Sequence, residues 1–344
     1  MYKHADLNLL NQTNLNQIIE GLRLDAKCIT YEKHRHFGFY NIELGNNCQT
    51  SKFSRFIPDI GLKLRSLSIP ILRPIPQEGI IQLQVVESDP AIIPFNSLYS
   101  KPLQGMVPCL LGEKEGRSPF WLDLASNPHM LVVGSTGSGK SVLLHTLLNN
   151  LVRQSDVSIY LIDPKQVEFS SYSKNRRFGR IVNEYNDAIN LLNFLVKDME
   201  QRYEIMRDIR ITSLEQNPNF FNKIVVIIDE INDLLLSDKS KKLQTLLIKL
   251  AQKGRAAGIY LVAATQRPSA DIINGLVKAN FEGRLVCRVT SRVDSQIVLN
   301  SSGAELLLGK GDALFSNKSN NLVRVQIAYS SPDDVLKSIK TVKY

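Results

Sequence analysis

Cysteine is scarce in this sequence, and its spacing excludes two classes of small stabilised domain. Only four of the 344 residues are cysteines: Cys28, Cys48, Cys109 and Cys287. They form no CxxC pair and no His/Cys cluster, which disulfide frameworks and structural zinc sites require. The sequence therefore indicates a protein of a reducing compartment, and we expect a cytoplasmic location.

Long hydrophobic runs are lacking as well. Apolar stretches such as IVVII, residues 224–228, are far shorter than the roughly 18 residues that a membrane-spanning helix needs. The opening MYKHADLNLLNQ has no apolar core behind a basic start, which a signal peptide would show. We expect no membrane insertion by this chain and a frayed polar N-terminus over residues 1–14.

Positive charge, in contrast, is in excess. Lysine and arginine number 42 against 33 aspartates and glutamates, which gives a net charge of +9. A surplus of this size fits a polyanionic partner such as a nucleic acid, and it equally fits an ordinary basic surface. Charge alone does not decide between the two.

Two parts of the chain differ in their residue patterns. Residues 15–105 mix helical and strand patterns and contain repeated prolines, which predicts a small α+β domain. Residues 106–344 contain short continuous apolar runs separated by helical stretches, which is typical of parallel strands buried on both faces. We therefore predict an α/β domain with a mostly parallel sheet there. Its strands are expected at HMLVVG (129–134), VSIYLI (157–162), KIVVII (223–228), IYLVAA (259–264) and RLVCRV (284–289).

The first of these runs leads into the phosphate-binding pattern G-x-x-x-x-G-K-[ST]. A strand before it and an amphipathic helix after it give the context that a P-loop requires. Gly137 and Gly139 let backbone N–H groups turn inward around an anion. Lys140 can reach the β- and γ-phosphates, and the Ser141 hydroxyl can ligate Mg²⁺. The predicted nucleotide-binding residues are Gly134, Ser135, Thr136, Gly137, Ser138, Gly139, Lys140 and Ser141.

A P-loop enzyme also needs a carboxylate near the metal and a group that handles water. The run KIVVIIDE ends in both: Asp229 is predicted to hold Mg²⁺, and Glu230 to orient or deprotonate the attacking water. The alternative is that this acidic pair caps the helix that follows. Asp163, in LIDPKQVE, ends another strand, and for it a structural turn and a nucleotide contact both stay open.

The nucleotide is expected to be ATP. A GTPase would normally carry an Asn/Thr-Lys-x-Asp guanine reader, and none occurs in this sequence. ATP and Mg²⁺ are therefore the predicted cofactors, and ATP hydrolysis is the predicted reaction. These motifs do not decide what the hydrolysis drives.

Further stretches go beyond a generic P-loop protein. They are HMLVVGSTGSGKS, LIDPKQVEF, KDMEQRYEIM, IVVIIDEINDLLL, LAQKGRAAGIYLVAATQRPS, INGLVKANFEGR and GAELLLGKGDALF. In this order and spacing they resemble the FtsK/SpoIIIE family of hexameric double-stranded DNA translocases, over most of residues 107–330. The resemblance implies a RecA-like P-loop NTPase domain at 106–344, with residues 15–105 similar to the family's small α domain. It also implies ATP-driven, largely sequence-independent translocation of double-stranded DNA by a homo-hexameric ring.

The resemblance gives two more residues a predicted catalytic role. Gln266 matches the family's sensor beside the γ-phosphate, at the end of the fourth strand. Arg255 matches a proposed arginine finger that reaches the neighbouring subunit's site, and arginine offers a permanently charged fork for a phosphoryl group. The alternative for Arg255 is a solvated arginine beside Lys253 at a helix C-terminus.

DNA contacts are expected near the family's pore loops, which lie close to residues 278–292. The candidates there are Lys278, Arg284 and Arg292, because basic side chains can make and release phosphate contacts repeatedly. A solvated basic strand edge is the alternative. The family has an arginine at the position where this sequence has Gln296. We expect this difference to alter the contacts with DNA.

Two other functions stay open. Related motors move protein or nucleoprotein through secretion and conjugation machines, but usually with repeated ATPase domains or a membrane anchor, which this sequence lacks. A nucleotide-binding regulator could assemble without turnover, but Lys140, Asp229 and Glu230 are all intact. The family's membrane helices, linker and winged-helix module are also lacking, so we expect either a naturally soluble motor or a trimmed one.

Overall fold

The chain forms two compact units, one made mainly of residues up to Ala91 and the other mainly of residues from Ile92 onward. The sequence analysis placed this boundary later, between residues 105 and 106. The difference arises because the segment after Ala91 pairs with the C-terminal part of the second unit. The backbone N–H of Tyr329 donates to the carbonyl of Ile93 over 2.7 Å, and that of Phe95 donates to the carbonyl of Tyr329 over 2.9 Å. The computed structural model describes residues 4–100, 102–115, 118–268, 279–317 and 322–341.

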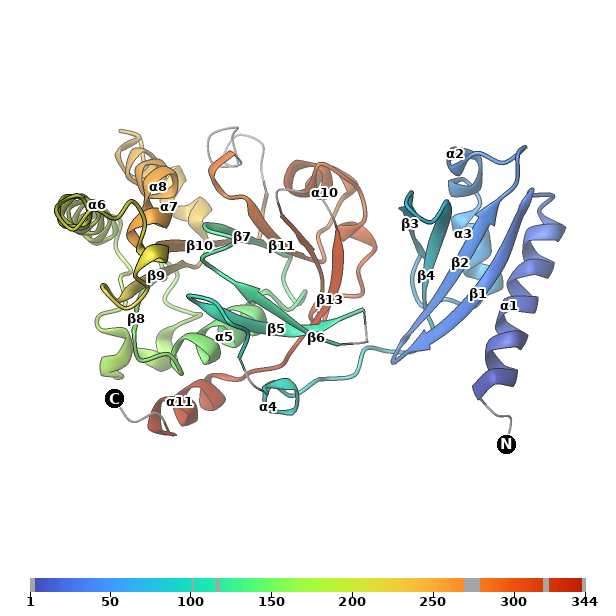
Figure 1. The fold of residues 1–344 in the computed structure, drawn as a ribbon, viewed down its shortest axis with the longest axis horizontal. Helices are drawn as coiled ribbons and strands as arrows, with labels where there is room; N and C mark the ends of the chain where they lie inside the picture. The colour runs from blue at the N-terminus through green and yellow to red at the C-terminus, as the bar shows by residue number, and fades with distance from the viewer. Residues whose placement is uncertain (1–3, 101, 116–117, 269–278, 318–321, 342–344) are drawn as a thin grey trace. The chain divides into compact units, whose positions relative to one another are not determined.

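The first unit is a four-stranded antiparallel sheet with three helices among its described residues (Figure 1). Leu15 of the first helix, Phe53, Ile60 and Leu83 share one buried core, and the α+β architecture predicted for this part is confirmed. The strand order is β1-β2-β4-β3. The elements are α1 (His4–Gly21), β1 (Ala26–His34), β2 (Phe37–Leu44), α2 (Thr50–Ser54), α3 (Ile57–Lys63), β3 (Ile71–Ile75) and β4 (Ile80–Val86).

The N-terminus differs from the frayed segment expected over residues 1–14, because α1 begins at His4. The polar side chains that indicated a loose chain bind β1 instead. Gln12 Nε2 donates to the carbonyls of Cys28 and Ile29 over 3.1 and 2.8 Å, and Asn16 Oδ1 accepts from the N–H of Cys28 over 2.7 Å. Since β1 is an edge strand, α1 supplies hydrogen-bond partners that no further strand provides.

The second unit is built on a nine-stranded mixed sheet, counted over the described residues, in the order β6-β5-β13-β12-β11-β7-β10-β9-β8. Strands β11, β7, β10, β9 and β8 are parallel, and they are the five apolar runs identified in the sequence. Strands β12, β13 and β5 extend the sheet antiparallel from β11. The predicted α/β class is confirmed, and the antiparallel extension is what the run pattern did not predict. The strands are β5 (Pro108–Lys114), β6 (Ser118–Asp123), β7 (Met130–Val133), β8 (Val157–Ile162), β9 (Lys223–Ile228), β10 (Ile259–Thr265), β11 (Gly283–Cys287), β12 (Asp312–Ser316) and β13 (Val323–Ile327).

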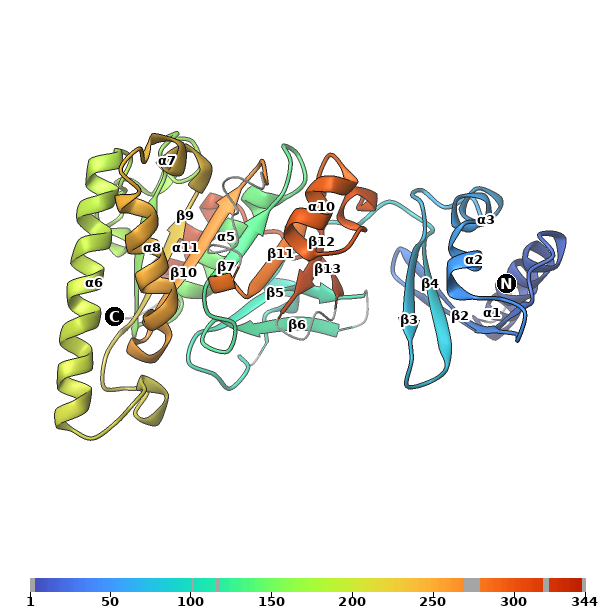
Figure 2. The same cartoon turned by 90° about the horizontal axis from the view of Figure 1, so that it is seen from above.

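Helices cover this sheet. Leu144 and Leu148 of α5 share a core with Val132 and Val225 of the strands and Val335 of α11. Helices α6 and α8 lie side by side (Figures 1 and 2), and every residue of β9 and β10 is buried, which explains their unbroken apolar runs. In the described part of the chain, no helix combines the length and apolar character needed to cross a membrane. The helices are α4 (Phe95–Leu98), α5 (Lys140–Leu151), α6 (Tyr185–Asp208), α7 (Ile231–Ser237), α8 (Lys242–Lys253), α10 (Arg292–Leu299) and α11 (Pro332–Thr341).

Candidate nucleotide-binding site

The phosphate loop connects β7 to α5, which begins at Lys140. Gly137 and Gly139 have φ angles of +75° and +107°, a region that favours glycine. Space is also restricted at Gly139, where a Cβ atom would lie 2.4 Å from the backbone nitrogen of Gly311. The sequence prediction that glycines are needed here therefore agrees with the geometry, through backbone conformation at both positions and through close packing at Gly139.

Neighbouring strand ends hold the loop in place. The backbone N–H of Gly134 donates to the carbonyl of Thr265 at the end of β10, over 3.2 Å. The N–H of Ser135 donates to the carbonyl of Arg288, just after β11, over 2.9 Å. These bonds fix the loop at the carboxyl edge of the parallel strands, where ligands of α/β folds commonly bind. A cavity of about 380 Å³ opens beside the loop.

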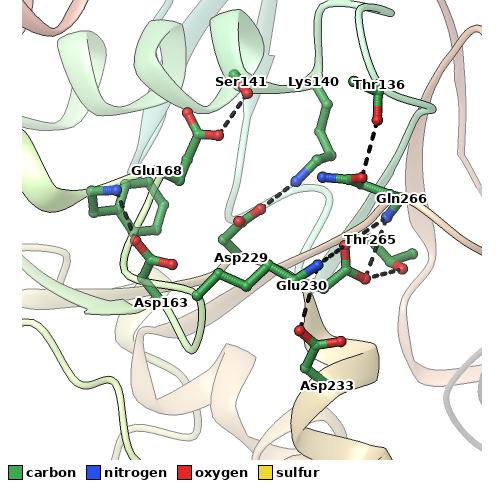
Figure 3. A network of polar contacts seen from close by, with 12 residues as sticks. Thr136, Lys140, Ser141, Asp163, Glu168, Asp229, Glu230, Asp233, Thr265 and Gln266 are labelled. Atoms are coloured by element: carbon green, nitrogen blue, oxygen red, sulfur yellow. Dashed lines mark hydrogen bonds and ion pairs between the residues drawn. The ribbon is translucent and has the colours of Figure 1, made fainter.

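Lys140 forms an ion pair with Asp229, the first residue after β9 (Figure 3). Both side chains are buried. Burial raises the pKa of Asp229, and the positive charge of Lys140 acts in the opposite direction. The predicted phosphate-binding lysine and the predicted metal carboxylate are thus brought together although they lie 89 residues apart in the chain.

Glu230 is held from several sides (Figure 3). The Thr265 hydroxyl donates to its Oε1 over 2.8 Å, the backbone N–H of Gln266 donates to its Oε2 over 3.2 Å, and Lys165 Nζ lies 3.5 Å from Oε2. Glu230 occupies the N-cap position of α7, but its side chain makes no capping bond. The helix-cap alternative therefore does not describe Glu230, whose carboxylate instead meets the end of β10.

Gln266 joins Glu230 to the phosphate loop. Its side-chain Oε1 accepts a hydrogen bond from the Thr136 hydroxyl over 3.3 Å, while its backbone N–H binds Glu230 (Figure 3). One residue thus contacts the loop on one side and the predicted water-handling carboxylate on the other. This placement fits a residue that responds to what the loop binds.

The sequence analysis missed Glu168, although it lies in the quoted stretch LIDPKQVEF. The Ser141 hydroxyl donates to Glu168 Oε2 over 2.6 Å, and His145 Nε2 lies 3.1 Å from Oε1. Burial acts to raise the pKa of Glu168, but bonds from His145 and Ser141 outweigh it and hold the pKa below its ordinary value. The signal available in the sequence was a second acidic residue five positions after Asp163.

Asp163 closes a turn. Its Oδ2 accepts a hydrogen bond from the backbone N–H of Phe169 over 2.9 Å, so the geometry supports the structural role among the two left open. Its Oδ1 is buried without a hydrogen-bond partner among the described residues. With Ser141, Glu168 and Asp229 nearby, the site offers the oxygen donors that Mg²⁺ prefers. Within the described ranges no three or more acidic, His or Cys residues form a metal cluster.

Known proteins are similar to this chain in sequence. Residues 100–223 and 215–270 match the FtsK/SpoIIIE family. The DNA translocase FtsK of Chlamydia muridarum is 41% identical over 352 residues, which cover 95% of this chain and 44% of that protein. FtsK of Streptococcus pyogenes serotype M6 is 33% identical over 99% of this chain and 45% of its own length. This chain belongs to the FtsK/SpoIIIE family.

The chain spans less than half the length of these two FtsK proteins. Solved structures share its fold. The pCW3 conjugation coupling protein TcpA, a monomer form with ATPγS, has a TM-score of 0.68 at 23% identity, over 95% of this chain and 99% of that one. The type VII secretion ATPase EccC of Thermomonospora curvata has a TM-score of 0.60 at 23% identity, over 73% of this chain and 33% of that one. Both likenesses concern the fold, and they agree with the α/β ATPase architecture.

Arg255, the candidate arginine finger of this FtsK/SpoIIIE chain, lies far from the chain's own phosphate loop. Arg255 precedes β10 and Gln266 follows it, and a strand of this length spans roughly 20 Å. The Arg255 side chain is 47% exposed, and its Nε lies 3.2 Å from Oε1 of Glu215. Arg255 is therefore not part of the site formed by its own chain, and its location fits both a solvated ion pair and a residue that serves a neighbour.

The candidate DNA contacts differ in exposure. Arg284 is half-buried, its Nη1 donates to the carbonyl of Val298 in α10 over 3.1 Å, and burial lowers the pKa of its guanidinium. Arg292, the first residue of α10, is exposed. Lys278 lies outside the described residues. Of the two described candidates of this family member, Arg292 is thus the one on the surface, while Arg284 supports α10.

Proposed function

We propose that this chain is the ATP-hydrolysing motor of a homo-hexameric ring that translocates double-stranded DNA. The observation that carries the proposal is the meeting of Lys140, Asp229 and Glu230 at the carboxyl ends of β7 and β9. A chain that only bound nucleotide would need Lys140 and Asp229, but no second carboxylate held in place to accept a proton from water. The 41% identity to a bacterial DNA translocase supports duplex DNA as what is moved and a bacterial cytoplasm as the location.

In this proposal the phosphate loop and Lys140 hold the triphosphate. Backbone N–H groups at the start of α5 point toward an anion, and the helix N-terminus favours negative charge there. Lys140 exchanges its contact with Asp229 for the β- and γ-phosphate oxygens. Because the donors are fixed before the reaction, they stabilise the charge that develops on the transferred phosphoryl group.

Ser141 and Asp229 are the residues proposed to hold Mg²⁺. Glu168 accepts the hydroxyl proton of Ser141 in a hydrogen bond, which leaves the lone pairs of that oxygen free to face the metal. A Mg²⁺ ion held by these residues would supply positive charge that offsets the negative charge of the nucleotide phosphates.

Glu230 is proposed to accept the proton of the attacking water. A general base of this kind contributes roughly 10²–10⁴-fold in rate. Thr265 and the backbone of Gln266 fix its carboxylate, so it does not have to be oriented during the reaction. Through Thr136, Gln266 would couple the occupation of the loop to the position of Glu230.

Arg255 is proposed to act on the nucleotide of the adjacent subunit. Its exposed ion pair with Glu215 is of a kind worth only about 0–1 kcal/mol, so the guanidinium is free to exchange partners when a neighbour docks. An arginine finger supplies on the order of 10³–10⁵ in rate. Such a contact would make hydrolysis in one subunit depend on the next.

DNA is proposed to pass through the ring by phosphate contacts without base reading. The net charge of +9 and the exposed Arg292 support this, with Lys278 as a further candidate. Contacts of this type are independent of sequence and weaken steeply with salt.

A protein-moving ATPase is the second candidate, because the fold neighbours TcpA and EccC are named for conjugation and secretion. Their identity of 23% is well below the 41% to a DNA translocase, so the sequence favours DNA. A regulator without turnover is opposed by the complete set of catalytic side chains.

The test is steady-state ATP hydrolysis by the full chain with linear duplex DNA, with single-stranded DNA and without DNA. We expect several-fold stimulation by duplex DNA of any sequence, which falls as salt rises. Displacement of a third strand from the end of a triplex would report movement, with Lys140→Ala as the inactive control. Turnover that ignores duplex DNA, together with no binding at low salt, would exclude the translocase and favour the second candidate.

A further inference from the structure

Lys165 lies beside Glu230, the proposed general base, but takes no part in the steps proposed for hydrolysis. It belongs to the turn DPKQ (163–166) that follows β8. Its Nζ lies 3.5 Å from Glu230 Oε2 and 3.4 Å from Asp233 Oδ2. The two carboxylates lie one helical turn apart at the start of α7 (Figure 3). A single ammonium group is thus held between them.

The backbone on both sides of this contact is unusual. In the turn, the N–H of Gln166 donates to the carbonyl of Asp163 over 3.1 Å, and Gln166 has a φ of +57°. Glu230 itself has a φ of +51°. Residues other than glycine rarely adopt this region, and they keep it only where the surrounding structure requires it. Both ends of the contact are therefore set by the fold and not by side-chain freedom alone.

The charges around Glu230 give a cation something to do there. Glu230 directly follows Asp229, and both side chains are buried. Asp229 pairs with Lys140, which is proposed to move to the nucleotide phosphates. Lys165 would then remain beside Glu230 as its counter-charge. Because a buried carboxylate without a counter-charge is unfavourable and a triphosphate adds more negative charge, the loss of Lys165 would favour movement of the Glu230 side chain away from the site.

Lys165 stays charged in this position. Burial acts to lower the pKa of Lys165, but the carboxylates of Glu230 and Asp233 outweigh it and raise the pKa above its ordinary value. The side chain is 43% exposed, and an ion pair at such exposure contributes little to folding stability. Its effect on the placement of Glu230 is therefore a better explanation of the contact than stability.

We propose that Lys165 is a positioning residue, whose ammonium group holds Glu230 Oε2 so that the carboxylate stays at the end of β10 when a triphosphate is bound. The Thr265 hydroxyl, at 2.8 Å, holds the other oxygen. Lys165 does not touch the nucleotide in this role. The inference rests on the proposed function, since it takes Glu230 as the group that accepts the proton of the attacking water.

The first experiment separates turnover from binding. ATP hydrolysis by the full chain is measured against ATP concentration, and the affinity for ATPγS with Mg²⁺ is measured by isothermal titration. Lys165→Met is expected to lower kcat roughly tenfold, since a misplaced catalytic group is costly, and to leave KM and the ATPγS affinity within about threefold of wild type. Lys165→Arg, which keeps the positive charge, should recover most of the lost turnover.

Lys249→Met is the matched control. Lys249, on α8, is 41% exposed and also pairs with a carboxylate, that of Glu200. Its loss removes a lysine of the same exposure and the same kind of contact, but not one that touches Glu230. We expect kcat, KM and ATPγS affinity as in the wild type.

A double-variant cycle shows whether Lys165 acts through Glu230. In the Glu230→Gln background the carboxylate is gone, so adding Lys165→Met should lower single-turnover hydrolysis by less than about twofold. A further tenfold loss there, or a clearly weaker ATPγS affinity, would show that Lys165 acts on the nucleotide itself, and would overturn the inference. A wild-type kcat in Lys165→Met would overturn it as well and leave Glu230 as the base. If Glu230→Gln alone keeps wild-type turnover, the proposed function of Glu230 fails instead.

Discussion

The Ser141 hydroxyl donates a hydrogen bond to the Glu168 carboxylate, with 2.6 Å between the two oxygens. His145 holds the other carboxylate oxygen at 3.1 Å, and Tyr172 in turn binds His145 Nδ1 over 2.9 Å. A chain of hydrogen-bonded side chains thus sets the orientation of a hydroxyl that is predicted to face Mg²⁺. Residues that orient a metal ligand affect metal affinity even though they do not touch the metal.

We therefore expect Glu168→Gln to raise the Mg²⁺ concentration needed for half-maximal ATP hydrolysis by about tenfold or more. The reason is that an uncharged amide accepts more weakly from the Ser141 hydroxyl. Hydrolysis measured against Mg²⁺ at saturating ATP is the readout. Glu184→Gln, which changes an exposed carboxylate before α6, is the control. An unaltered Mg²⁺ requirement in Glu168→Gln would contradict this role.

Lys140→Met should reduce stability in a pH-dependent way. Burial already raises the folded-state pKa of Asp229, and Lys140 opposes the rise, so its loss moves that pKa further above the unfolded value of about 3.9. A carboxyl with a raised folded-state pKa stabilises the fold at low pH and loses that contribution as pH rises through the folded pKa. The deficit relative to wild type, about 3 kcal/mol at neutral pH for a broken buried pair, should therefore shrink at pH 5.

Thermal melting at pH 5 and pH 7 measures this effect. The double variant Lys140→Met/Asp229→Asn is the control, because it lacks the Asp229 carboxyl, and its deficit should change less between the two pH values than that of the single variant. Equal stability deficits for the single variant at the two pH values would show that Lys140 does not lower the pKa of Asp229.

Glu230→Gln should separate binding from hydrolysis. The glutamine side chain keeps an oxygen for the Thr265 hydroxyl but cannot take a proton from water. We expect the ATP affinity to stay within about threefold of wild type and the turnover rate to fall by about 10²-fold or more. Single-turnover hydrolysis and equilibrium ATP binding are the two measurements. Asp233→Asn, which changes an acidic residue one turn along α7, should leave both nearly unchanged, and a turnover of Glu230→Gln close to wild type would remove Glu230 from the mechanism.

Gly139→Ala and Gly137→Ala form a matched pair within the phosphate loop. Both positions have a positive φ, which alone costs about 1 kcal/mol or more for alanine. Only at Gly139 would the new Cβ meet another backbone, 2.4 Å from the nitrogen of Gly311; at Gly137 nothing lies within 4 Å. Gly139→Ala should therefore lower Tm clearly more than Gly137→Ala. Equal Tm values would mean that the loop can move away from Gly311 without loss.

Arg255→Ala should act on neighbouring subunits. Wild-type and Arg255→Ala chains are mixed at constant total concentration, and ATP hydrolysis is measured against the variant fraction. If one subunit's arginine serves the next site, activity falls more steeply than the fraction of wild-type chain. Lys253→Ala, an exposed neighbour of like charge, should leave activity unchanged at every ratio. A linear decrease with Arg255→Ala would assign this arginine to its own chain or to the surface.

The parts of the protein that could be predicted from its residues are those whose requirements lie in consecutive positions. The P-loop needs its glycines, Lys140 and Ser141 within eight positions, and the buried strands need only continuous apolar runs, so both were predicted at the places where the structure has them. The acidic pair Asp229 and Glu230 was predicted for the same reason, because it directly follows β9.

Which side chains come into contact depends on the three-dimensional fold. Whether Glu168 reaches Ser141, or Lys165 reaches Glu230, depends on strand order and on pairing between segments far apart in the chain. The same holds for the N-terminus, where local polarity indicated a loose chain and hydrogen bonds from Gln12 and Asn16 to β1 support a helix. Local pattern fixes what a segment can form, while long-range packing and hydrogen bonding select its partners, and it is the partners that make the site.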